Sequence, residues 1–148
     1  MIADSHQHEQ FDHVLAEHRH LRRLIQRLRN LLFEQQESGF VVGGLLDELR
    51  DDLVTHFAHE EKGGYFDEVV TVAPRLKTRV DSLLSQHPQL MLTIDELRDS
   101  VEEGEIPEGA WPTLTKSFEQ FVVDFVQHEE HENQLLQEAY FRDETAGD

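Results

Sequence analysis

Long runs of apolar residues spaced three and four apart constrain the fold of this chain more than any other feature. Four segments show this spacing, at about residues 7–36, 45–66, 74–101 and 111–140. The spacing places apolar side chains along one side of a helix, where they can face a core. No stretch alternates apolar and polar residues for long. The pattern therefore predicts an all-α fold.

Stretches that contain glycine or proline separate the four segments, at residues 38–44, 63–74 and 104–109. Within the first of them, we expect Phe40, Val41 and Val42 to form a loop that tucks against the core. Short links between long helices imply antiparallel neighbours, so we predict an up-down-up-down antiparallel four-helix bundle. At 148 residues the chain is expected to form a single domain, 1–148.

The charge of the chain argues against two classes of partner. There are 13 Lys and Arg against 31 Asp and Glu, for a formal net charge of −18. Such a balance disfavours binding to nucleic acid or to anionic membranes. No apolar run reaches the roughly 18–20 residues of a membrane span, and the first residues lack a secretory signal. We therefore expect a cytoplasmic protein, and no protein partner can be named.

The chain has no cysteine but ten histidines. The absence of thiols excludes disulfides, thiolate metal sites and thiol catalysis. Imidazole and carboxylate ligands suit iron, manganese or zinc. The composition therefore permits a metal site without locating it.

Polar residues occupy six positions in the apolar stripes. Each segment has one stripe histidine, and two segments add a glutamate four residues later. Residues at this spacing lie on one face of a helix, with Cβ atoms about 5–6 Å apart, and can reach a common metal. These candidate ligands are His18, His56, Glu60, His87, His128 and Glu132.

Two inward glutamates require partners, because a buried charge without one is costly and the stripes contain few cations. Bound divalent cations would reconcile them with the inward histidines. Each half of the chain supplies one histidine and one His-x-x-x-Glu pair, which indicates two metals. The division by halves assigns His18, His56 and Glu60 to one metal and His87, His128 and Glu132 to the other, unless the carboxylates bridge both.

The other histidines have simpler interpretations. A single histidine on an apolar stripe is usually a core residue with a polar partner, but six polar residues on four helices are hard to explain by packing alone. His6, His8, His13 and His20 lie off the stripes and are expected at the surface. His59 and His131 are expected near the edge of the site, in supporting or surface roles. Tyr65 is expected to pack, and Glu129 is expected on a solvated face.

The order His18, His56-x-x-x-Glu60, His87, His128-x-x-x-Glu132 resembles the hemerythrin-like, or HHE, cation-binding family. The resemblance covers about residues 8–141. It implies a non-haem di-iron centre of two iron ions inside a four-helix bundle, with the two glutamates bridging or capping the irons. Zinc and manganese are the alternative metals.

Two positions depart from the oxygen-carrying hemerythrins. Those proteins have a second histidine four residues after the one in the third helix, where this chain has Met91. They also have an aspartate where this chain has Asn133. The chain thus resembles the bacterial branch of the family. Fewer protein ligands would leave more coordination positions for water, O2, peroxide or NO.

The leading hypothesis is a di-iron protein that binds or senses O2 or a related small oxidant such as peroxide or NO, with iron buffering as a further role. A di-iron oxidase or peroxidase is one alternative. A zinc- or manganese-binding module, or a purely structural helical module, is another. No separate acid, base or substrate pocket is visible in the sequence, so no catalytic residue is assigned.

Overall fold

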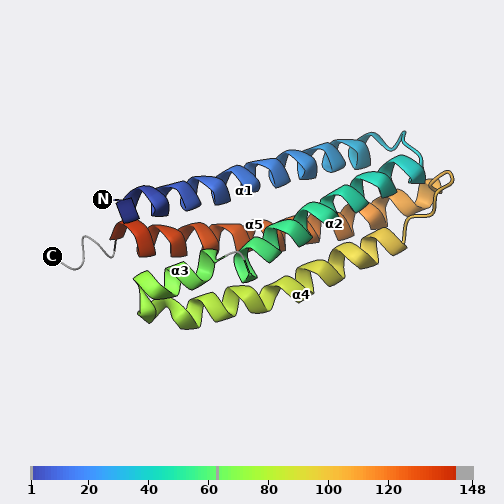
Figure 1. Ribbon diagram of the computed structural model, residues 1–148. Coiled ribbons are helices and arrows are strands. Elements are labelled where there is room, and N and C mark those ends of the chain that lie inside the picture. The colour runs from blue at the N-terminus through green and yellow to red at the C-terminus, as the bar shows by residue number, and fades with distance from the viewer. Residues whose placement is uncertain (1, 63, 143–148) are drawn as a thin grey trace.

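The computed structural model describes residues 2–62 and 64–142, and these residues form helices and no strand. Four long helices lie side by side along the molecule, and a shorter helix covers one end (Figure 1). The helices are α1 (Ile2–Glu34), α2 (Gly39–Glu61), α3 (Tyr65–Val72), α4 (Lys77–Asp99) and α5 (Trp111–Gln137). The predicted all-α fold and helical bundle are confirmed. None of the described helices is long and apolar enough to cross a membrane.

A layer of polar residues divides the core into two apolar clusters. The larger cluster packs α1, α2, α4 and α5 together around residues such as Leu49 and Phe121, and the smaller one packs α3 against the other end of the bundle. On α4, Leu83 belongs to the smaller cluster and Leu90 to the larger, and His87 lies between them. The polar layer is thus enclosed by apolar side chains on both sides along the bundle axis.

The start of α2 differs from the prediction. The Ser38 hydroxyl caps the helix by accepting a hydrogen bond from the Val41 amide at 3.4 Å, so residues 40–42 form the first turn and not a loop. Phe40 is 72% exposed and does not tuck against the core. The apolar sequence of this turn suggested burial, but only its Val42 face meets the other helices.

Helix α3 was not predicted, because its eight residues are too few to show helical periodicity. Tyr65, Phe66 and Val69 are buried and close the smaller apolar cluster. Gly64 caps this helix with φ +93°, a conformation that glycine adopts without strain. Pro74 then opens a 3-10 turn, Pro74–Leu76, that leads into α4, close to the predicted start.

Proline also occurs inside α4. A proline cannot donate the backbone hydrogen bond that continues a helix, and it therefore often breaks or kinks the helix that contains it. The helix nevertheless runs through Pro88 from Lys77 to Asp99. The Pro88 side chain is exposed. The loss of one hydrogen bond is therefore accommodated on the solvent side of the bundle.

Candidate metal centre

All six predicted side chains meet in the polar layer of the core. None is more than 3% exposed, and each of the four long helices contributes at least one. They form two groups whose potential ligand atoms lie within 4.8 Å of one another. The first group is His18, His56, Glu60 and Glu132, and the second is Glu60, His87, His128 and Glu132. The histidines divide by halves of the chain, whereas both glutamates belong to both groups.

Each carboxylate directs one oxygen toward each pair of histidines. Glu132 Oε1 lies 2.9 Å from His18 Nε2, and its Oε2 lies 2.8 Å from His128 Nε2. Glu60 Oε1 lies 2.9 Å from His87 Nε2, and its Oε2 lies 3.4 Å from His56 Nε2. This is the arrangement expected of two carboxylates that lie between two cation positions.

Most of these inward atoms lack a hydrogen bond from any described residue, despite the short distances. They are Nε2 of His56, His87 and His128, both oxygens of Glu60, and Oε2 of Glu132. A buried polar atom without a partner costs free energy, and a buried charge costs more. Nitrogen and oxygen atoms that approach closely without hydrogen-bond geometry fit ligands that point to a shared cation. The residues present therefore fit a divalent metal pair.

Hydrogen bonds at the outer nitrogens orient two of the imidazoles. His56 Nδ1 lies 2.5 Å from Glu17 Oε2, and His128 Nδ1 lies 2.7 Å from Gln86 Oε1. Since an amide oxygen only accepts, His128 must donate its Nδ1–H, which leaves the Nε2 lone pair facing the centre. Partners of this kind fix the tautomer of metal-binding histidines. Neither Glu17 nor Gln86 was identified from the sequence, because only the packing of different helices brings them to these rings.

A buried carboxylate lies beside the outer nitrogen of a third imidazole. Glu129 is fully buried, which corrects the prediction that it lies on a solvated face. Its Oε1 accepts a hydrogen bond from Arg22 Nε at 2.6 Å, and its Oε2 lies 3.8 Å from His18 Nδ1. The sequence did contain a signal: Glu129 follows Phe125 by four residues, at the edge of the apolar stripe of α5.

The fourth imidazole, that of His87, contacts an aromatic ring and lies near a surface carboxylate. His87 stacks on Phe57 with ring centroids 3.8 Å apart and planes within 9° of parallel. Its Nδ1 lies 3.7 Å from Glu61 Oε1, a half-exposed carboxylate. Burial, followed by the electrostatic effect of the neighbouring His128 imidazole, lowers the pKa of His87 to about 4. The ring is therefore neutral near pH 7, as a metal ligand must be.

The two central carboxyls have pKa values shifted in opposite directions. Burial and the negative charge of Glu132 raise the pKa of Glu60 well above its ordinary value. Burial would also raise the pKa of Glu132, but its interactions with Glu60 and the surrounding histidines lower it well below normal. Burial opposes the charged form of His56, but Glu132, Glu17 and Glu60 raise its pKa well above 6.5. The cation-free centre therefore retains protons that a metal would displace.

The remaining histidines lie outside the buried groups. The side chains of His13 and His20 are 58% and 55% exposed, as predicted, and His131 is exposed. His59 Nδ1 lies 2.7 Å from Glu17 Oε1, so it contacts the centre through a residue that supports His56. The side chains of His6 and His8 lie outside the described part of the structure.

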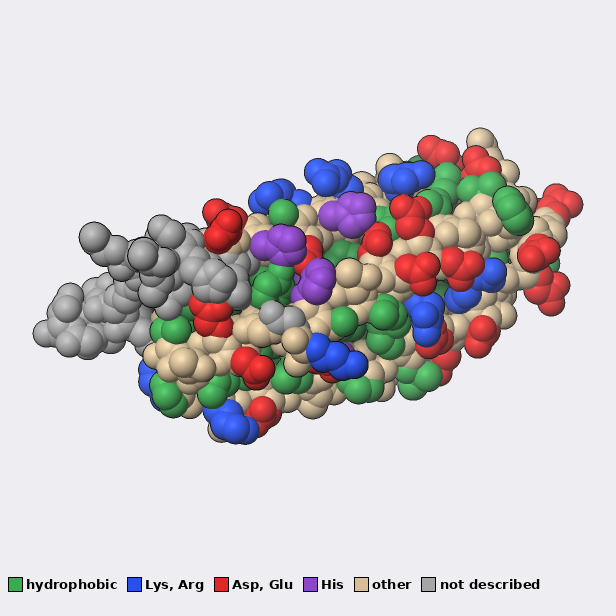
Figure 2. Space-filling view, in the orientation of Figure 1, with side chains coloured by type: hydrophobic (Ala, Val, Ile, Leu, Met, Phe, Trp, Pro, Cys, Tyr) green, Lys and Arg blue, Asp and Glu red, His purple; other side chains and the backbone are tan. Residues whose placement is uncertain are grey.

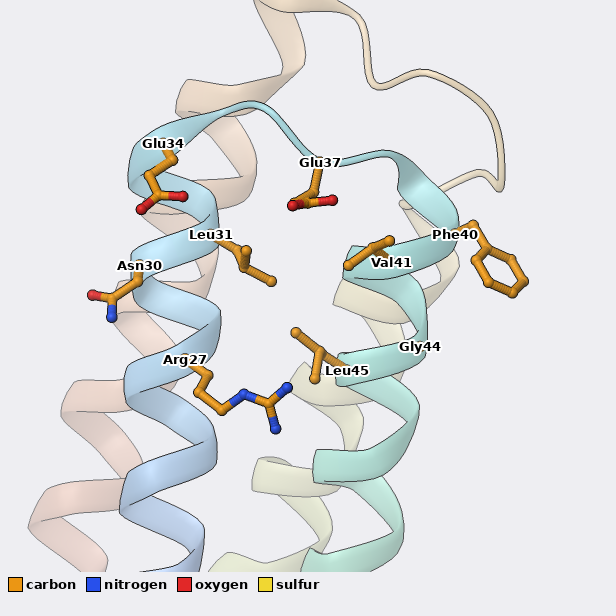
Figure 3. Close-up of a pocket in the computed structure, with 9 residues that line it drawn as sticks. All are labelled: Arg27, Asn30, Leu31, Glu34, Glu37, Phe40, Val41, Gly44 and Leu45. Atoms are coloured by element: carbon orange, nitrogen blue, oxygen red, sulfur yellow. The ribbon is translucent and has the colours of Figure 1, made fainter.

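A surface hollow of about 580 Å³ lies away from these groups, between the end of α1 and the start of α2 (Figure 3). Its lining includes Arg27, Leu31 and Phe40, but no residue of the metal groups. Size alone does not make it the functional site, because no cluster of ligating or nucleophilic side chains faces it.

Comparison with known families agrees with the donor set. The hemerythrin HHE cation-binding domain model matches residues 9–140. The chain belongs to the hemerythrin HHE cation-binding domain family. This hemerythrin-like chain matches no curated protein and no solved structure. Domains of the family bind metal ions, and the buried groups are where this hemerythrin-like domain could hold them.

Proposed function

We propose that this protein holds a non-haem di-iron centre that binds or senses O2 or a related small oxidant such as peroxide or NO. The observation that carries the proposal is the pair of shared carboxylates, each with one oxygen toward each pair of histidines. His18 and His56 would hold one iron, and His87 and His128 the other. Glu60 and Glu132 would lie between the two ions.

The donor chemistry supports iron with free coordination positions. Two imidazoles and two carboxylates per cation form a nitrogen and oxygen set that suits iron, manganese or zinc. A metal with open positions can bind a small exogenous ligand. Surface hollows of about 220 and 330 Å³ have His128 and His56 in their linings, and they offer small molecules an approach to each group.

Two residues favour the bacterial branch of the family over the oxygen carriers. Met91 packs against the larger apolar cluster and supplies no imidazole. Asn133 is half-buried, and its side-chain oxygen has no hydrogen-bond partner among the described residues. We infer a centre with fewer protein ligands than the carriers have, and therefore sensing, oxidant binding or iron buffering in place of oxygen transport.

The topology and domain organisation follow from the same family assignment. We propose an up-down-up-down bundle in one domain. The four-residue link between Glu34 and Gly39 supports antiparallel packing of α1 and α2.

Iron loading tests the proposed function directly. Protein freed of metal is loaded with Fe(II) without oxygen, its iron is counted, and absorption is recorded after addition of O2, NO or peroxide. We expect about two irons per chain and a ligand-dependent spectrum. The double variant Glu60→Ala/Glu132→Ala should lose both. The matched variant Glu102→Ala/Glu103→Ala, in an exposed loop, should keep both.

Three results would change the proposal. An iron content near zero, or full iron retention in Glu60→Ala/Glu132→Ala, would contradict the di-iron centre. Retention of zinc or manganese in preference to iron would show that iron is not the metal of this centre. Repeated consumption of peroxide with an added reductant would identify an enzyme in place of a sensor or binding protein.

A further inference from the structure

A second cluster of ligating side chains lies at the surface, beside the buried groups. His13 and Glu17 are one turn apart on α1, and His59 faces them from α2. Their potential ligand atoms lie within 4.8 Å of one another. Figure 2 shows histidine side chains gathered on one part of the exposed face, close to acidic side chains. None of the six buried residues belongs to this cluster.

The cluster converges on a single oxygen atom. Glu17 Oε1 lies 3.1 Å from His13 Nε2 and 2.7 Å from His59 Nδ1. The side chains of His13, Glu17 and His59 are 58%, 18% and 42% exposed, respectively. Tyr65 Oη donates to the same oxygen at 3.4 Å. Two imidazoles and one carboxylate therefore face one point that solvent can reach.

We propose that His13, Glu17 and His59 form a third cation site, which takes a divalent transition-metal ion such as Zn(II) or Co(II) from solvent. Imidazole nitrogen selects these ions over Mg²⁺ and Ca²⁺, which prefer oxygen ligands. Three protein ligands leave a fourth position for water, as in open zinc sites.

The distances require little rearrangement. Ligands held about 2.0–2.2 Å from a tetrahedral ion are roughly 3.3–3.5 Å apart. The observed separations from Glu17 Oε1, 3.1 Å and 2.7 Å, need to open by about 0.2–0.4 Å and 0.6–0.8 Å, respectively. The histidines can move because both are substantially exposed. A hollow of about 330 Å³ has all three residues in its lining, which leaves room for an ion with bound water.

One side chain connects this surface site with the buried centre. Glu17 directs Oε1 to the surface cluster, while its Oε2 bonds His56 Nδ1 at 2.5 Å. An ion at the surface therefore lies one carboxylate away from a buried histidine. The net charge of −18 also favours the approach of cations to this face. The surface ion would lie on the solvent side of the hollow whose lining also includes His56.

Counting bound Co(II) tests the proposal. The metal-free protein is dialysed to equilibrium against Co(II), and cobalt per chain is measured. We expect three ions in the wild type and two in His13→Ala/His59→Ala. His20→Ala is the matched control, because His20 is exposed in the same hollow but pairs with Asp52, and it should retain three. Two ions in the wild type, or three in the double variant, would overturn the third site.

A second measurement uses the wild-type chain, so that it does not depend on the folding of a variant. Two equivalents of Zn(II), enough for the two buried groups alone, are added first, and imidazole NMR signals are recorded as paramagnetic Co(II) is added. Broadening should appear first at His13 and His59. Broadening that begins at His20 or His131 would contradict the proposal.

Cobalt counts in the variants distinguish failure of the surface site from failure of the buried centre. In Glu60→Ala/Glu132→Ala, the surface site should still bind one Co(II). A chain that binds two ions only in its buried groups disproves the surface site alone. A chain that binds one ion, lost in His13→Ala/His59→Ala, disproves the buried pair alone.

Discussion

The orientation of each buried imidazole depends on the partner of its outer nitrogen. Gln86 Oε1 holds His128 Nδ1 at 2.7 Å, and Glu17 Oε2 holds His56 Nδ1 at 2.5 Å. These partners leave both Nε2 atoms facing the shared carboxylates. The affinity of the centre should therefore depend on residues that never touch the metal.

Replacement of the amide that holds His128 tests this dependence. Gln86→Leu should weaken metal binding at the buried centre by about 10- to 100-fold, because the ring loses its fixed tautomer and orientation. Gln89→Leu, at an exposed position on α4, is the matched control and should leave affinity unchanged. Competition with a coloured chelator measures both. Equal affinities in the two variants would exclude an orienting role for Gln86.

The buried Glu129 predicts an unequal effect of two arginines on the same helix. Arg22→Ala should lower the free energy of unfolding by about 2–4 kcal/mol, because it leaves a fully buried carboxylate without its cation. Arg29→Ala breaks an exposed pair with Glu119 and should cost less than about 1 kcal/mol. Urea unfolding of the metal-free variants measures the difference, and similar losses would show that Glu129 does not need Arg22.

At the scale of elements, the ends of the helices set how closely they approach. Gly39 begins α2, and its amide donates to the Gly104 carbonyl at 2.8 Å. A Cβ atom built on Gly39 would lie 1.6 Å from the Glu102 carbonyl oxygen. The loop before α5 therefore packs directly on the start of α2. A side chain at this position would push the two elements apart.

This contact predicts opposite effects of one substitution at two glycines of α2. Gly39→Ala should lower the free energy of unfolding by about 2–3 kcal/mol, since backbone must move to admit the methyl group. Gly44→Ala has open space around it and should raise stability by about 0.5–1 kcal/mol, because alanine favours the helix. Chemical denaturation measures both. If Gly39→Ala left the free energy of unfolding unchanged, the loop before α5 could move away from the methyl group without loss of stability.

At the scale of the whole molecule, two apolar clusters enclose one polar layer. The apolar clusters and the polar layer have opposite effects on stability. The apolar clusters stabilise the bundle through burial. The polar layer brings together carboxylates and imidazoles that must be neutralised by protons or by metal. The stability of the bundle should therefore depend on which of these two partners is present.

Metal and pH should consequently act on the melting temperature together. The pKa of Glu60 is raised above 4.5 and that of His56 above 6.5 in the folded state, so the stability that their bound protons contribute is lost as pH rises, from 4.5 for Glu60 and from 6.5 for His56. The metal-free protein should become less stable from pH 6.5 to 8. Metal binding displaces those protons and strengthens as pH rises. At about 100 times the dissociation constant it adds about 2.7 kcal/mol, or roughly 5–10 °C.

Thermal unfolding with and without Zn(II), used as a redox-inert probe, measures this effect. The difference between the two melting temperatures should widen from pH 6.5 to 8, and a chelator should abolish it. A difference that narrows with pH would mean that metal does not replace protons in the polar layer.

The sequence by itself determined the four long helices and the six inward polar positions. Apolar spacing and a His-x-x-x-Glu pair are local properties of a single helix, so they can be read without knowledge of its neighbours. It did not determine α3, the burial of Glu129, or the roles of Glu17 and Gln86. Only the tertiary structure decided those, because they depend on which side chain a second helix presents. The position of both glutamates between the two histidine pairs also depends on how the helices pack together, so no spacing along one helix could establish it.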